Sequence, residues 1–294
     1  MKKTKNVLFL ILTKPEDVPK NFITLSSVAE HLKTGVIYLF STVKLNSAVL
    51  HDFEKCANDR VSVVIKFLKS SDLNRLDLLI QILRDLKEID KILYISNECL
   101  ALANLDELFR QSMQEKVLLC RKFDNDCTLD TNVILFNIIR WHSFCTKNQV
   151  SAQNWDAQMY ACSGNLLPDF SYFSGDYGQL SPQRLNQIKI LCFNPQKPWY
   201  NLSAPLGYLW WRRARQTRFY GRILSQNKKI FKSYGTGRLL AFDYFYQNED
   251  KFLPLMKAYI KESFFFLFTF GVRAECHKKN LIRLRQQIIQ KAAQ

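Results

Sequence analysis

The sequence lacks most of the short motifs that announce a familiar chemistry. None of its eight cysteines forms a Cys-x-x-Cys pair, and it contains no P-loop, no His-Glu-x-x-His and no Gly-x-Ser-x-Gly segment. These absences argue against a zinc ribbon, a P-loop nucleotidase, a zinc peptidase and a serine hydrolase. Several cysteines stand within apolar runs, as in Leu118-Leu119-Cys120, which favours buried reduced thiols over a disulfide framework.

Long apolar runs are also missing. No stretch reaches the ~18–20 apolar residues that a membrane-spanning helix needs, and Ser263–Val272, which comes nearest, is too short. The apolar run within Met1–Leu12 is shorter than that of a secretory signal, and no small-residue cleavage site follows it. We therefore expect a buried first strand there instead of a leader peptide.

Acidic residues are scarce towards the carboxyl terminus. The 294 residues carry a net charge of +16, and residues 209–294 hold 18 Lys and Arg against 5 Asp and Glu. So uneven a charge predicts an anionic partner for this part of the chain, either a membrane surface or a nucleic acid. With 47% hydrophobic residues, the chain can also bury a sizeable core.

Strand-like and helix-like segments alternate through the first half of the chain. Short apolar runs rich in branched residues predict strands, and apolar stripes between them predict helices. This alternation indicates an α/β fold whose central sheet is mostly parallel and flanked by helices. The composition changes near residue 200, so we expect a domain over residues 1–200 and a basic, mainly helical region over 201–294. The predicted strands are Val7–Leu12, Gly35–Ser41, Val61–Leu68 and Lys91–Ile95, and the predicted helices are Asn21–Leu32, Asn46–Cys56 and Leu73–Ile89.

Four segments, in this order along the chain, carry a pattern that recurs in one enzyme family: Lys91–Phe109, Leu129–Trp141, Asn154–Tyr160 and Lys189–Trp199. They resemble segments of glycosyltransferase family eight, the group of glycogenin and of bacterial lipopolysaccharide galactosyl- and glucosyltransferases. In that family a strand ends in Asp-x-Asp before a helix that begins Glu-Leu-Phe. Further on come a Phe-Asn-Ala-Gly segment, an Asp-Gln-Asp segment and a closing His-Phe-x-Gly…Lys-Pro-Trp. The resemblance covers roughly residues 5–200 and implies a GT-A fold and a nucleotide-diphosphate sugar donor.

The resemblance also implies Mn²⁺ or Mg²⁺, but the metal ligands are replaced. Ser96 and Glu98 stand at the Asp-x-Asp positions, and Cys192 stands at the family's histidine. Only Glu98 is a conventional ligand for a hard divalent ion, so we assign no set of metal ligands from the sequence. Ser96, Glu98 and Lys197 are the candidate donor-binding residues, with Lys197 on the diphosphate.

Asp130, Asp156 and Gln158 are the candidate catalytic residues, because they fall in the segments that surround the reaction centre in the resembled family. Each candidate also has a plainer interpretation. The two aspartates could hold local backbone amides, Cys192 could be a structural thiol, and Glu98 could be a solvated loop carboxylate.

The basic region combines cations with aromatic rings. Leu209–Ser233 contains eight Lys and Arg and no acid, and Lys278–Lys291 predicts an amphipathic basic helix. This pattern suits the interface of an anionic bilayer, and it could also hold a nucleic-acid backbone. We favour the membrane. The candidate membrane-binding residues are Trp210, Trp211, Arg212, Arg213, Arg215 and Arg218.

The sequence thus predicts a glycosyltransferase that moves a hexose from a nucleotide sugar, UDP-sugar first, to a lipid-linked glycan such as lipopolysaccharide. It would work in the cytoplasm on the inner face of the membrane, with or without a metal ion. Two alternatives stay open. The chain could be a catalytically inactive protein of the same fold that binds a glycan or a partner glycosyltransferase, or it could bind nucleic acid through its basic region.

Overall fold

A computed structural model describes residues 6–69, 73–86, 89–123, 126–179, 186–201, 204–227, 252–267 and 272–292. The chain divides into two compact units, which we describe separately. The first comprises residues 1–172 and 188–192, and the second comprises residues 173–187 and 193–294. The domain boundary expected near residue 200 lies inside the second unit.

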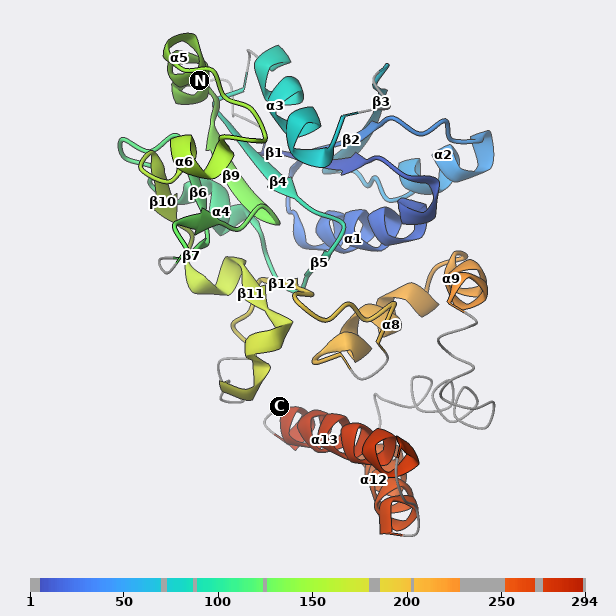
Figure 1. Ribbon diagram of the computed structural model, residues 1–294. Coiled ribbons are helices and arrows are strands. Elements are labelled where there is room, and N and C mark those ends of the chain that lie inside the picture. The colour runs from blue at the N-terminus through green and yellow to red at the C-terminus, as the bar shows by residue number, and fades with distance from the viewer. Residues whose placement is uncertain are drawn as a thin grey trace. The chain divides into compact units, whose positions relative to one another are not determined.

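A seven-stranded sheet forms the centre of the first unit (Figure 1). Its order is β10-β6-β9-β4-β1-β2-β3, and β9 runs antiparallel to both of its neighbours while the other pairs are parallel. The mostly parallel sheet predicted from the sequence is therefore confirmed. The strands are β1 (Asn6–Leu12), β2 (Gly35–Ser41), β3 (Val61–Phe67), β4 (Lys91–Ile95), β6 (Leu118–Cys120), β9 (Val133–Asn137) and β10 (Ser163–Asn165).

Helices cover both faces of this sheet (Figure 1). Asparagine N-caps start three of them: the side chains of Asn46, Asn74 and Asn137 accept hydrogen bonds from amides of the first helical turn. These caps explain why each helix begins directly after a short polar break. The helices and the short 3-10 turns are η1 (Pro15–Asp17), α1 (Val18–His31), α2 (Ser47–Glu54), α3 (Arg75–Asp85), α4 (Asp106–Arg110), α5 (Ile138–Lys147), α6 (Trp155–Met159) and η2 (Pro168–Phe170).

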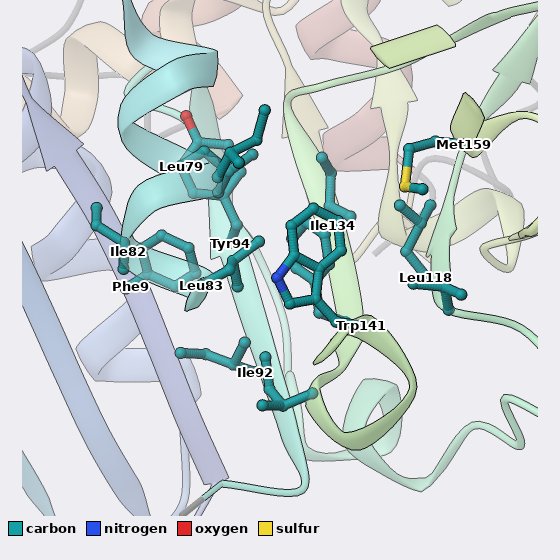
Figure 2. Packing of buried hydrophobic residues seen from close by; sticks show 14 of the residues in the cluster. Phe9, Leu79, Ile82, Leu83, Ile92, Tyr94, Leu118, Ile134, Trp141 and Met159 are labelled. Carbon is teal, nitrogen blue, oxygen red and sulfur yellow. The ribbon is translucent and has the colours of Figure 1, made fainter. Parts of the chain in front are cut away.

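The core on one face lies between the sheet, α3 and α5 (Figure 2). Strand alternation sends Phe9 of β1 and Tyr94 of β4 to this face, where their ring centroids are 5.2 Å apart. Trp141 of α5 packs edge-on against Phe136 of β9. The alternate residues of β1, such as Leu8, are buried on the opposite face, where α1 contacts β1. Burial on both faces explains why the strands read as continuous apolar runs.

Two small sheets extend the first unit beyond the strand ends. β5 (Cys99–Ala101) pairs antiparallel with β12 (Ile190–Cys192), in a sheet of order β11-β12-β5 that includes β11 (Tyr172–Phe173). β7 (Lys122–Phe123) pairs with β8 (Thr128–Leu129). Both small sheets flank the point where β4 ends, and they position the residues of the candidate site.

The described part of the second unit is mainly helical, as predicted. It contains η3 (Ser174–Gln179), α8 (Gly207–Arg215), α9 (Tyr220–Gln226), α12 (Phe252–Leu267) and α13 (Val272–Ala292). α12 and α13 pack against each other, and His277 Nδ1 lies 2.6 Å from a carboxylate oxygen of Glu262 across this pair. Parts of two segments named from the sequence, residues 228–233 and 268–271, lie outside the described residues.

No helix within the described ranges is both long enough and apolar enough to cross a bilayer.

Candidate functional site

The candidate site lies where β4 ends. Ser96 follows β4, and Asn132 precedes the antiparallel strand β9, so the two residues face each other. The Ser96 hydroxyl donates to Asn132 Oδ1 at 2.8 Å, and the Ser96 amide donates to the Asn132 carbonyl at 2.8 Å. Ser96 is fully buried. Its hydroxyl therefore ties two strand ends together.

Asp130 continues this network. Its Oδ1 accepts from the Asn132 amide at 3.0 Å and from Asn132 Nδ2 at 2.8 Å, and its Oδ2 accepts from the Ser171 hydroxyl at 2.8 Å. Burial raises the pKa of Asp130, while the hydrogen bonds from Ser171 and Asn132 and the charge of Arg121 oppose this rise. Both carboxylate oxygens already hold donors. We call Ser96, Asn132, Asp130 and Ser171 the polar cluster.

Cys192 borders the polar cluster from the small sheet. It stands opposite Cys99 in the β5–β12 pairing, and the two sulfur atoms are 3.2 Å apart. Burial, followed by the neighbouring Cys99, raises the pKa of Cys192 well above its usual range. Both cysteines are free and buried. The residue that stands at the histidine position of the resembled family is therefore a buried, protonated thiol.

Glu98 is half-buried on the turn between β4 and β5, and its amide donates to the Ser96 hydroxyl at 3.3 Å. Across from it lies Arg75, the first residue of α3. Tyr94, Glu98, Cys99 and Asp130 all raise the pKa of Arg75, with Tyr94 as the largest contributor, and burial opposes them. Glu98 and Asp130 are therefore close enough to Arg75 to act on it through their charge.

A cavity of about 250 Å³ opens beside Arg75. The Tyr94 hydroxyl is buried and has no hydrogen-bond partner among the described residues. Burial raises the pKa of Tyr94 to about 12, so this hydroxyl stays protonated as a donor. Figure 2 shows the Tyr94 ring beside Leu79 of α3. The lining residues are Asn74, Arg75, Leu76, Leu79, Tyr94 and Thr131, and we call this space the Arg75 cavity.

Asp156 and Gln158 both lie on α6. Asp156 Oδ1 accepts from the Leu129 amide at 2.9 Å, which ties α6 to the residue just before Asp130. Gln158 Nε2 donates to the Gln149 carbonyl at 3.1 Å, and its Oε1 is buried without a partner in the described part of the chain. Asp156 thus performs the backbone duty that the plainer interpretation gave it.

Lys197 belongs to the second unit. It is half-buried, and its carbonyl accepts from the amides of Tyr200 at 3.0 Å and Asn201 at 2.9 Å. These bonds form the turn that carries Trp199, whose ring is buried. Glu98 and Asp130, by contrast, lie in the first unit.

Two of the residues predicted to bind a membrane, Trp210 and Trp211, are buried instead. Trp210 and Trp211 are 0% and 1% exposed, so they cannot serve as surface anchors in this conformation. Trp210 packs on Trp199 with ring centroids 5.2 Å apart, and Trp211 Nε1 donates to the Pro198 carbonyl at 3.1 Å. The apolar face of α8 is core. The four arginines Arg212, Arg213, Arg215 and Arg218 are exposed or half-buried, and their membrane role stays a prediction.

Arg75, Tyr94 and Thr131 were missed from the sequence. Arg75 was assigned only to a helical stripe, and Tyr94 only to a buried strand. A usable signal existed, because Asn74 is a strong N-cap and Arg75 directly follows it at a helix start that precedes β4. What the sequence could not give is the direction of the Arg75 side chain.

The expected divalent ion finds a poor donor set here. No group of three His, Cys, Asp or Glu side chains that could hold a metal occurs among the described residues. The Asp130 carboxylate already accepts hydrogen bonds, and the Ser96 hydroxyl donates a hydrogen bond to Asn132. Cys192 is a buried thiol with a raised pKa. Glu98 alone remains as a hard oxygen ligand, and a Mn²⁺ or Mg²⁺ ion needs more than one.

Solved structures with a similar fold are glycosyltransferases. WbbM, a bifunctional glycosyltransferase, matches with a TM-score of 0.61 and 11% identity over 76% of this chain and 52% of that one. GlyE of Streptococcus pneumoniae TIGR4 matches with 0.59 and 17% over 77% of this chain and 64% of that one. The galactosyltransferase LgtC, solved with donor and acceptor sugar analogues, matches with 0.55 and 10% over 72% of this chain and 96% of that one.

The chain spans about half the length of WbbM and less than two thirds of GlyE. No protein-family model matches the sequence, and no curated protein sequence matches it. At these identities the likeness establishes the fold. The chain has the GT-A fold of nucleotide-sugar glycosyltransferases, as the sequence predicted.

Proposed function

We propose that this protein is a glycosyltransferase related to family eight. It transfers a hexose from a nucleotide-diphosphate sugar, UDP-sugar first, to a lipid-linked glycan such as lipopolysaccharide. The Arg75 cavity carries this proposal. It lies at the carboxyl end of β4, and ligands of open α/β sheets bind beyond the carboxyl ends of the strands.

The lining of the cavity suits a sugar attached to a phosphate. Asn74, Arg75, Tyr94 and Thr131 present an amide, a guanidinium and two hydroxyls, while Leu76 and Leu79 supply an apolar wall. A few convergent polar groups on a partly apolar wall are typical of a small-molecule site. The buried Tyr94 hydroxyl has no partner among the residues that the structure describes, so a ligand hydroxyl or phosphate oxygen would satisfy it.

The test is calorimetric titration of the protein with UDP and UDP-hexoses, with and without Mn²⁺, together with a donor hydrolysis assay. We expect UDP binding, and we expect Thr131→Tyr, which fills the cavity, to weaken it by at least ~10-fold. Thr146→Tyr is the matched control, because Thr146 is exposed on α5 away from the cavity lining. Equal affinity in the wild type and in Thr131→Tyr would remove the cavity from the donor site.

The inactive alternative has one observation in its favour. Both oxygens of Asp130 and the Ser96 hydroxyl serve the protein itself, so fewer groups remain for chemistry. A protein of this kind would bind UDP or a glycan without hydrolysing any donor. Donor turnover above the background of the Thr131→Tyr variant would rule this alternative out.

We place the anionic membrane contact on α12. Ile260, Phe264 and Leu267 are 62%, 60% and 71% exposed, and their spacing of four and three residues puts them on one helix face. Lys257 and Lys261 are exposed on the same helix. Apolar residues edged by lysines suit the headgroup region of an anionic bilayer, on the cytoplasmic side.

Co-sedimentation with vesicles tests this contact. We expect binding to phosphatidylglycerol vesicles at low salt, little binding to phosphatidylcholine, and a loss of binding in a Phe264→Glu, Leu267→Glu double variant. Ile139→Glu is the control, because Ile139 is 67% exposed on α5. Unchanged binding by the double variant would sink the assignment to α12.

A further inference from the structure

The first turn of α3 is built to hold Arg75 in place. The side chain of Asn74 accepts from the amides of Leu76 and Asp77 at 2.9 Å and donates to Asp77 Oδ2 at 2.7 Å. The other oxygen of Asp77 accepts from the Ala152 amide at 3.1 Å. Further along α3, Leu79 and Leu83 are buried against the sheet. The backbone of Arg75 is therefore fixed at the mouth of the cavity.

Three kinds of positive or donating group meet in this cavity. Arg75 contributes a guanidinium, which stays protonated at any physiological pH. α3 contributes the positive end of its dipole, and its 11 residues make this a full-length helix. Tyr94 contributes a buried hydroxyl with no partner among the described residues. The ligand chemistry that these groups share is that of a phosphate or diphosphate oxygen.

The carboxylates nearby do not cancel this preference. Asp130 is buried, and its charge is spread over three hydrogen bonds from Asn132 and Ser171. Glu98 is half-buried on the β4–β5 turn. Both carboxylates act on Arg75 through their charge, which raises the pKa of the guanidinium. Of the predicted metal positions Ser96, Glu98 and Cys192, only Glu98 is a hard oxygen ligand, and one such ligand is too few for a divalent ion.

We propose that Arg75 supplies to the donor diphosphate the positive charge that a divalent ion supplies in metal-dependent enzymes, so that the Arg75 cavity binds a nucleoside diphosphate without metal. This inference rests on the proposed function. During transfer the bond between the anomeric carbon and the β-phosphate oxygen breaks, and its electron pair leaves with the diphosphate. The acceptor oxygen bonds to the anomeric carbon and gives its proton to the diphosphate or to solvent. Arg75 stabilises the charge that develops on the leaving oxygen.

The experiment compares uridine, UMP and UDP by calorimetry in EDTA and in Mn²⁺. The proteins are the wild type, Arg75→Gln, Arg75→Lys and the control Arg110→Gln, whose arginine is exposed on α4. We expect wild-type UDP affinity in EDTA within about threefold of that in Mn²⁺. We expect Arg75→Gln to weaken UDP by about 30- to 100-fold, as for loss of a charge-assisted pair, and uridine by less than about threefold. Arg75→Lys should recover part of the UDP affinity.

Each other outcome overturns the inference in a recognisable way. UDP binding that requires Mn²⁺, or that Arg75→Gln leaves unchanged, removes the role of Arg75 while the proposed function stands. If the wild type binds no nucleoside diphosphate in either condition, the proposed function fails with it. If Arg75→Gln does not fold, the wild-type preference for UDP over uridine in EDTA and its reduction in Arg75→Lys decide the question.

Discussion

Two regions meet at the carboxyl end of β4, and they differ in whether their polar groups are satisfied. In the polar cluster, Ser96, Asn132, Asp130 and Ser171 use one another as donors and acceptors. In the Arg75 cavity, the Tyr94 hydroxyl has no protein partner in the described part of the chain, and the space beside it is open. A satisfied network stabilises a fold, whereas an unsatisfied buried donor beside a cavity is a group to which a ligand can bind by a hydrogen bond.

This difference changes which residues are the candidates for ligand binding. The segments that resemble a glycosyltransferase motif point to Ser96, Asp130 and Cys192. The side chains of these residues are buried and interact with other residues of the protein. The groups that remain able to bind are those that line the Arg75 cavity, on α3 and on Tyr94. The comparison predicts that substitutions in the polar cluster reduce stability, and that substitutions in the cavity reduce binding.

The largest effect on stability is expected from Asp130→Ala. It leaves the Asn132 amide, Asn132 Nδ2 and the Ser171 hydroxyl without their acceptor in a buried place. Buried donors without partners cost about 1–3 kcal/mol each, and partial relaxation brings the expected loss in the free energy of unfolding to about 3 kcal/mol. Urea unfolding measures it, with Asp126→Ala as the exposed control. A loss no larger than that of the control would show that the cluster is not structural.

A smaller, pH-dependent effect is expected from Asp130→Asn. Burial raises the pKa of Asp130 in the folded protein, so the carboxyl contributes most stability below its ordinary pKa. That contribution is lost as the pH rises through the raised folded value. The asparagine variant keeps an acceptor for Asn132 and carries no charge. Its free energy of unfolding relative to the wild type should therefore rise from about pH 4 towards neutrality, and a flat difference across this window would contradict the assignment.

The smallest effect on stability is expected from Tyr94→Phe. The substitution removes a buried hydroxyl that has no partner within the described ranges, so the free energy of unfolding should change by less than about 1 kcal/mol. If the cavity holds the donor, the same variant should weaken UDP-sugar binding several-fold. Thermal unfolding and calorimetry on one preparation test both halves. A large loss of stability would show that the hydroxyl serves the core.

Much of the fold could be predicted from the sequence, because its signals are local. The predicted strands Gly35–Ser41 and Lys91–Ile95 match β2 and β4, and the predicted helices at Asn46 and Leu73 match α2 and α3 within a few residues. Alternation, helical stripes and asparagine caps act over a few residues, so they are legible without the tertiary structure. The reversed direction of β9 was not predicted, since strand order depends on pairing between distant segments.

The functional residues divide along the same line. The sequence by itself determined that Ser96 and Glu98 follow the end of β4, and that the carboxyl-terminal region is basic and helical. Only the tertiary structure decided that Trp210 is core, that Cys192 faces Cys99, and that Arg75 and Tyr94 line one cavity. Which way a side chain points, and whether it meets solvent or another segment, depends on packing between parts of the chain that are far apart in sequence.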